Sequence, residues 1–208
     1  MLDLLINNPL VFLIWLISIL AAVSIHEFAH SFMADKLGDP TPRLAGRLTL
    51  NPIAHLDPLG TLALIVAQVG WGKPVPVDPY NFRNPKRDSA LVSLAGPLSN
   101  FILAGLISLI IKFLPLTLNP LLIFSFIYPF LAINIGLGVF NLIPIPPLDG
   151  SKVLTGLLPT NLALKVEETM AEYGLILLIA ILLPIFNGTS LASIVIFPII
   201  QTILGLLL

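Results

Sequence analysis

An almost unbroken apolar run at residues 9–25, PLVFLIWLISILAAVSI, leads directly into the pentapeptide HEFAH, and this junction constrains the fold most. A helix of about 20 such residues crosses the hydrocarbon core of a bilayer, which is about 30 Å thick. Charged residues make up only 10% of the chain, whereas soluble domains carry about 25%. We therefore expect an integral membrane protein whose first span contains three ionisable side chains.

The other apolar segments predict an all-α polytopic membrane protein with about five to six transmembrane helices. The expected spans are residues 9–36, 89–114, 120–143, 173–186 and 191–208. Residues 59–70 are too short to cross easily, so they are expected to be re-entrant or to form a short span. No stretch suits a separate soluble domain, and residues 1–208 are expected to form a single membrane-embedded domain.

The basic residues predict the orientation of these spans. Seven of the ten lysines and arginines lie between Lys36 and Arg87, and two more follow the 120–143 span. Because cytoplasmic loops are enriched in lysine and arginine, we expect the N-terminus outside the cell and these loops in the cytosol, provided that residues 59–70 do not cross. The net charge of −1, without a basic patch, gives no indication of nucleic-acid binding.

The segment GKPVPV, residues 72–77, alternates proline with other residues. Proline lacks the donor that a sheet needs, so this segment cannot be an interior strand. It is expected to be either a proline-rich loop or an extended edge strand or β-hairpin at the membrane surface. In the second case its free main-chain groups could pair with an unwound substrate segment.

His26, Glu27 and His30 match the pattern H-E-x-x-H. Residues four positions apart share a helix face, so both imidazoles can bind one zinc ion through nitrogens at about 2.0–2.1 Å. Glu27 is rotated by about 100° and could act as general base on a metal-bound water. The alternative is that these residues only join helices through hydrogen bonds, which is disfavoured because ionisable groups in lipid usually mark function.

Such a zinc site needs a third protein ligand, and Asp149 is one candidate. It follows PIPP, which cannot continue a helix, so the chain is expected to be unwound near membrane depth. The alternative is that Asp149 caps the short helix after it. Other candidates are His55, which is more typical of a loop histidine, and the cluster of Glu167, Glu168 and Glu172.

Three asparagines lie in the apolar segments. Asn141 precedes Asp149 by eight residues, and its amide could stabilise a developing oxyanion or form an interhelical hydrogen bond. Asn100, in the sequence GPLSN, and Asn134 are expected mainly to serve packing, with Gly96 permitting a close approach of helices. The alternative for Asn100 is a role in the site.

The motifs HEFAH, SLAGPLSN and NLIPIPPLDG together resemble the site-2 protease family of intramembrane zinc metalloproteases. NPIAHLDPLGT and GWGKPVPVDPYNF are similar to its small prokaryotic branch, so the resemblance covers roughly residues 23–158. It implies that His26, His30 and Asp149 hold one zinc ion, that Glu27 is the general base, and that Asn141 stabilises the oxyanion or holds substrate. We find no PDZ or CBS domain of the kind that larger members use.

The resemblance implies an endopeptidase of a prokaryotic cell membrane, which hydrolyses a peptide bond within or near a transmembrane segment of another membrane protein. A metal-ion transporter, with the three ligands as a transit site, and a catalytically silent zinc-binding scaffold are the alternatives. Glu27→Gln separates them, since it should abolish proteolysis while retaining the metal. Asp149→Ala without effect would instead favour a glutamate ligand.

Overall fold

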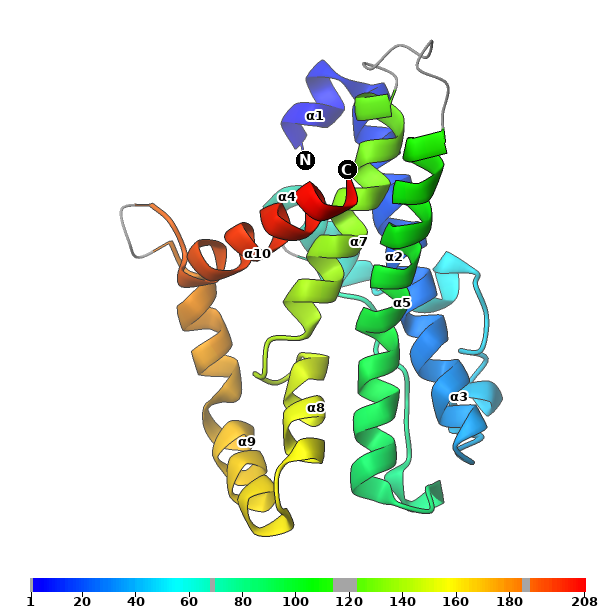
Figure 1. The fold of residues 1–208 in the computed structure, drawn as a ribbon, viewed down its shortest axis with the longest axis vertical. Helices are drawn as coiled ribbons and strands as arrows, with labels where there is room; N and C mark the ends of the chain where they lie inside the picture. Colours follow the sequence, from blue (N-terminus) through cyan, green and yellow to red (C-terminus); the bar gives the residue numbers. More distant parts are fainter. Residues whose placement is uncertain (1, 68–69, 114–122, 185–187) are drawn as a thin grey trace.

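The computed structural model describes residues 2–67, 70–113, 123–184 and 188–208, which fold into helices joined by loops (Figure 1). The elements in chain order are α1 (Leu2–Asn7), α2 (Pro9–Lys36), α3 (Thr41–Leu44), η1 (Pro52–His55), α4 (Pro58–Ala67), η2 (Pro79–Asn81), α5 (Pro85–Phe113), η3 (Ile123–Ile127), α7 (Tyr128–Asn141), α8 (Asp149–Leu157), α9 (Thr160–Leu182) and α10 (Leu191–Leu207). These residues contain no β-strand, and an isolated antiparallel bridge joins Leu56 to Gly72.

Two described helices, α2 and α5, are long and apolar enough to cross a membrane. Helix α2 has the predicted bounds, 9–36. Pro9 is at its first helical position, which suits a residue without an N–H group. Gly38, with φ of 108°, follows the last turn in the left-handed conformation that glycine favours. Helix α5 begins four residues before the predicted span.

The other apolar segments differ more from their predicted bounds. The segment expected at 120–143 consists of the π-helical turn η3 and α7, while residues 120–122 lie outside the described part. Helix α9 begins at Thr160 and not at residue 173, because strong helix formers fill its polar first half. Of the expected 173–186 span, residues 185–186 are not described. How many of these helices cross the membrane stays a prediction.

Helices α2, α5 and α7 pack against one another, and α8 packs against α5 (Figure 1). One buried apolar cluster joins α5, α7 and α10 through Ala104, Ile107, Leu131, Ile135, Val139 and Leu204. Helix α10 contacts α7 and α9, and α9 contacts α8. Helix α7, which comes late in the chain, therefore lies beside the first long helix, α2.

The predicted break after the 120–143 segment is confirmed. Helix α7 ends at Asn141 and α8 begins at Asp149, so the proline-rich stretch between them is not helical. Gly150 lies so close to the end of α7 that a Cβ atom there would be 2.2 Å from the carbonyl oxygen of Leu142. The chain therefore turns back sharply at this point, and that turn returns Asp149 to the helix bundle.

The segment after α4 follows the loop alternative and does not form a hairpin among the described residues. Val77 and Phe82 pack against Ala34 and Val92, which belong to α2 and α5. The loop is thereby held along α5 and along α2, the helix that carries His26, Glu27 and His30.

Candidate metal centre

His26, His30 and Asp149 meet in the folded chain. Nε2 of His26 lies 3.1 Å and Nε2 of His30 lies 3.3 Å from Oδ2 of Asp149. One ligand atom from each residue lies within 4.8 Å of the others, and both histidines are buried. Helix α2 supplies the two imidazoles from successive turns, and the first residue of α8 supplies the carboxylate.

This donor set fits a zinc ion. Zinc binds histidine nitrogen and carboxylate oxygen at about 2.0–2.2 Å in tetrahedral geometry, which separates neighbouring ligand atoms by about 3.3 Å. The two nitrogen–oxygen distances, 3.1 and 3.3 Å, are close to that separation. Three protein ligands also leave the fourth tetrahedral position for water or substrate, as catalytic zinc sites require.

Contacts on the far side of each imidazole orient the two rings. Nδ1 of His30 donates to the carbonyl of Val92 (2.7 Å), and Nδ1 of His26 lies 2.7 Å from Oδ1 of Asn100. Both partners are on α5. Such contacts fix the ring that binds a metal, and here they leave both Nε2 atoms directed at Asp149.

Gly96 allows α5 to lie this close to the histidines. A Cβ atom at this position would be 2.4 Å from Nε2 of His30 and 2.7 Å from Cε1 of His26. Real side chains do not approach so closely, so any residue larger than glycine would displace the imidazoles. Gly96 thus permits the close helix approach that was expected, and the helix approached is α2 at His26 and His30.

Asp149 does not cap its own helix. Leu148 is the N-cap residue of α8, and no side-chain capping hydrogen bond is formed there. The carboxylate points instead at the two histidines. The alternative considered for Asp149, a helix cap outside the site, is therefore not what the structure shows.

Glu27 lies beside Gly72, which is in the loop that follows α4. An added Cβ atom on Gly72 would be 3.9 Å from Oε1 of Glu27 and 3.5 Å from Cγ1 of Val23. The amide of Lys73 donates to the carbonyl of His55 (2.9 Å). Backbone of the 72–73 segment thus lies next to the carboxylate that the sequence predicts as general base.

Arg47 holds this loop together. Its buried guanidinium donates to the carbonyls of Ala54, Lys73 and Pro74. Ala54 precedes α4 and the other two residues follow it, so Arg47 joins the segments on both sides of this helix. Burial lowers the pKa of the Arg47 guanidinium, and the charge of Glu27 acts in the opposite direction. Sequence reasoning missed this role, because nothing local marks Arg47 as buried.

The remaining candidate residues form other hydrogen bonds or are exposed. The Asn141 amide, at the end of α7, donates to the Leu137 carbonyl (3.0 Å). His55 is fully buried and donates through Nε2 to the Thr49 carbonyl (2.8 Å), so it serves the loop. The three candidate glutamates are exposed on α9 and are not in the metal-binding group found among the described residues: Glu167, Glu168 and Glu172.

Asn100 has the less favoured of its two expected roles, because it contacts the site. It was expected mainly to serve packing, yet it contacts a predicted metal ligand directly. A signal was present: Gly96 and Asn100 are four residues apart, so they share a helix face. A buried amide on the face that a glycine opens to a neighbouring helix indicates a specific partner on that helix.

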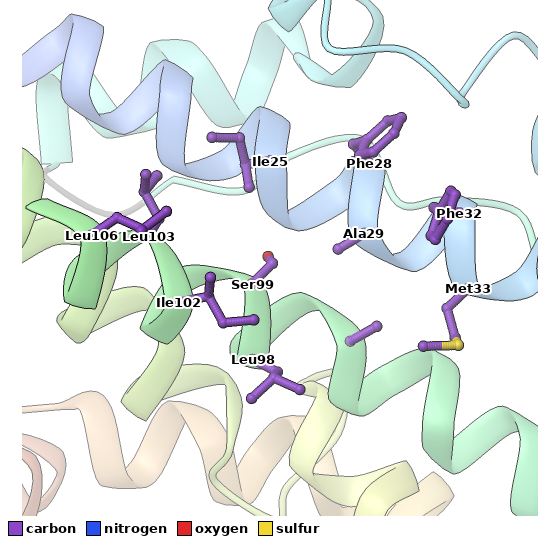
Figure 2. A pocket seen from close by; sticks show the side chains of 11 residues that line it. Ile25, Phe28, Ala29, Phe32, Met33, Leu98, Ser99, Ile102, Leu103 and Leu106 are labelled. Carbon is purple, nitrogen blue, oxygen red and sulfur yellow. The ribbon is translucent and has the colours of Figure 1, made fainter.

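An apolar groove of about 400 Å³ runs between α2 and α5 (Figure 2). Its walls include Phe28 and Phe32 of α2 and Leu98 and Ile102 of α5. None of the three metal-binding candidates lines it. The composition of the groove suits contact with lipid or with another apolar segment, and the hydroxyl of Ser99 in its lining donates to the Gly96 carbonyl.

Comparisons with known proteins agree with this geometry. Residues 116–183 match the model of Peptidase family M50. The chain is 38% identical over 191 residues to YwhC of Bacillus subtilis, which is assigned as a zinc metalloprotease, with 89% of this chain and 84% of that protein covered. It is 32% identical to Rip2 of Mycolicibacterium smegmatis, assigned likewise, with 83% and 68% covered. No solved structure matches.

Proposed function

The chain belongs to peptidase family M50, the membrane-embedded site-2 protease family, and is a zinc metalloprotease; from this premise we propose that it cleaves a transmembrane segment of another membrane protein. The observation that carries the proposal is the position of the predicted ligands along α2. His26 is 17 residues, or about 25 Å, from the start of this helix and about 15 Å from its end at Lys36. A site at that depth suits a substrate that is itself in the membrane.

We assign His26, His30 and Asp149 as the ligands of one zinc ion per chain. Bound zinc would lower the pKa of a water at its open position and polarise the scissile carbonyl. Glu27, next to His26 on the same helix, would take the proton of the attacking water and pass it to the leaving amine. Two neutral imidazoles and one carboxylate would hold a zinc ion with a net positive charge remaining at the site.

Asn141 is proposed to stabilise the oxyanion or to hold the substrate. An amide has two N–H donors, one of which donates to the Leu137 carbonyl in this structure. Asn141 ends α7 directly before the unwound segment that leads to Asp149. A small rotation of the side chain would exchange an intrahelical contact for one to substrate.

The 72–77 segment is proposed to bind the substrate main chain. Its regular pairing among the described residues is limited to the bridge at Gly72, while the carbonyls of Lys73 and Pro74 already accept hydrogen bonds from Arg47. Gly72 lies beside Glu27, so residues 75–77 are the part proposed to pair with substrate. A peptide bond inside a helix is shielded, so a substrate must unwind before cleavage. An unwound segment could then pair with this extended backbone.

For the whole chain we propose a single multi-pass domain of the prokaryotic cell membrane, with the N-terminus outside and the active site nearer the cytosolic side. The basic residues between Lys36 and Arg87 support this orientation. Two of them are at the end of α2 that lies nearer to His30: Lys36 is in its last turn, and Arg43 pairs with Asp35 there.

The proposal is tested with purified protein, a generic single-pass substrate and metal analysis. Glu27→Gln should retain one zinc ion and lose cleavage, whereas Asp149→Ala should lose both. Glu168→Gln, at an exposed position on α9, is the matched control and should leave both unchanged. Full zinc and activity in Asp149→Ala would refute the ligand set, and cleavage by Glu27→Gln would refute the general base.

A further inference from the structure

We propose that Asn100 and Asn134 are positioning residues, which together fix the ring nitrogen of His26 that faces the metal. The inference rests on the proposed role of His26 as a zinc ligand. It goes beyond that role because it assigns a task to two residues that contact neither the metal-binding carboxylate nor the proposed general base.

The two histidines of the site are oriented by different kinds of group. His30 donates through Nδ1 to the backbone carbonyl of Val92 (2.7 Å), and a carbonyl can only accept. That single contact places the hydrogen on Nδ1 and leaves Nε2 free. His26 instead faces the side-chain amide of Asn100 (2.7 Å), and an amide can present an acceptor or a donor. His26 is therefore correctly oriented only if Asn100 is.

The other contacts of Asn100 set its orientation. Its Nδ2 donates to Oδ1 of Asn134 (2.8 Å) and to the carbonyl of Ala22 (3.2 Å). Asn134 is oriented in turn, because its own Nδ2 donates to the carbonyl of Phe130 (2.8 Å). Both ends of the chain of hydrogen bonds are backbone carbonyls, which cannot donate. Rotating either amide would therefore bring two oxygen atoms into contact.

This chain of hydrogen bonds leaves only the oxygen of Asn100 facing His26. The hydrogen of a neutral His26 is then on Nδ1, and the lone pair of Nε2 points toward Asp149 and the metal position. The assignment follows from the network of partners, as it must for amides and imidazoles. Asn100 and Asn134 are both fully buried, so water cannot replace a lost partner.

The same amides join the three helices that surround the site. His26 is on α2, Asn100 on α5 and Asn134 on α7. Outer partners of metal-binding histidines typically change metal affinity by 10–100-fold when they are removed. The orientation of α7 relative to α2 is thus coupled to zinc affinity through two side chains.

The first test is zinc affinity, measured by competition with a chelator. Asn100→Leu keeps the size of the side chain and removes its hydrogen bonds, so the affinity should fall by about 10–100-fold. Asn134→Leu should cause a smaller loss, since the Ala22 carbonyl still orients Asn100. Ser18→Ala is the matched control: Ser18 is buried on α2 and donates to the Ile14 carbonyl, away from this network.

The second test is nitrogen NMR of zinc-loaded protein labelled in its three histidines. His26 and His30 should each show a hydrogen-bonded Nδ1–H, while His55 carries its hydrogen on Nε2. Asn100→Leu should remove the protected signal of His26 alone, and the other two histidines report that the variant is folded. Asn100→Asp should keep the signal, because a carboxylate accepts as the amide oxygen does.

Unchanged zinc affinity and an unchanged His26 signal in Asn100→Leu would overturn the proposal, as would an equal loss in Ser18→Ala. Wild-type affinity in Asn134→Leu would overturn the part played by Asn134, and that variant also carries the test if Asn100→Leu does not fold. Failure of the proposed function looks different. In that case zinc would leave the signals of His26 and His30 in the wild-type protein unmoved.

Discussion

Gly96 faces His30 so closely that a single added carbon atom would lie 2.4 Å from the nitrogen that points to the metal position. The pair spans two helices, α5 and α2, which pack along each other. The absence of a side chain at Gly96 therefore matters as much to the site as the presence of the imidazole.

Gly96→Ala should displace the imidazole of His30, weaken zinc binding by at least about tenfold and reduce cleavage in proportion. The reason is steric, because a contact shorter than 3.0 Å forces the ring or the helix to move. Gly105→Ala is the control, since it lies on the same helix with no atom within 4 Å of the added carbon. Equal zinc affinity in both variants, measured by chelator competition, would contradict the prediction.

The sequence predicted the parts of the site that follow from local rules. The four-residue spacing places His26 and His30 on one helix face, and prolines end the helix before Asp149. Both expectations need no knowledge of the fold. Asp149, which lies 123 residues after His26, was implied as the partner of these histidines by the family resemblance. Residue chemistry alone left a helix cap open as the alternative.

Other features could not be predicted, because they depend on contacts between distant segments. Asn100 and His26 are 74 residues apart, so an amide that orients a ligand looks like any polar residue in a span. The extent of α9 was underestimated for a different reason: hydropathy marks the part of a helix that suits lipid, while its polar continuation is helical by propensity.

Protonation of the Asp39 carboxylate should make the protein less stable in acid. Burial acts to raise the pKa of the Asp39 carboxyl, but hydrogen bonds from Thr41, Asp78 and Asn81 outweigh it and hold this pKa below its usual range. The carboxylate therefore contributes stability above the unfolded-state pKa of about 4, and this contribution is lost as the pH falls through the folded value.

Asp39→Asn should lower the thermal unfolding midpoint at neutral pH, and the difference from wild type should shrink below pH of about 4. Unfolding followed by circular dichroism in detergent at several pH values measures this. Glu168→Gln, an exposed substitution, is the control. A difference that grows as the pH falls would have the wrong sign and would reject the assignment.

Arg47→Lys should loosen the loop over Glu27 while zinc remains bound. One guanidinium reaches carbonyls on both sides of α4, and a lysine ammonium lacks the planar fork that makes this geometry possible. We expect faster backbone hydrogen exchange in residues 51–57 and 70–74 and a cleavage rate lowered several-fold. Arg43→Lys is the control, because Arg43 is exposed and pairs with Asp35 on the surface. Hydrogen-exchange rates equal to wild type in Arg47→Lys would count against the proposed role of Arg47 in joining the two segments.

Gly72→Val should block cleavage without removing zinc. A first carbon atom at this position already meets the His55 carbonyl at 3.2 Å and lies 3.9 Å from the Glu27 carboxylate, so the branched side chain of valine would occupy the space beside the general base. Gly72→Ala should be milder, because only the carbonyl contact is tight. Cleavage assays and metal analysis of both variants separate the possibilities. Loss of zinc in Gly72→Val would indicate a general disruption of the site, whereas full cleavage would show that substrate does not pass between this loop and Glu27.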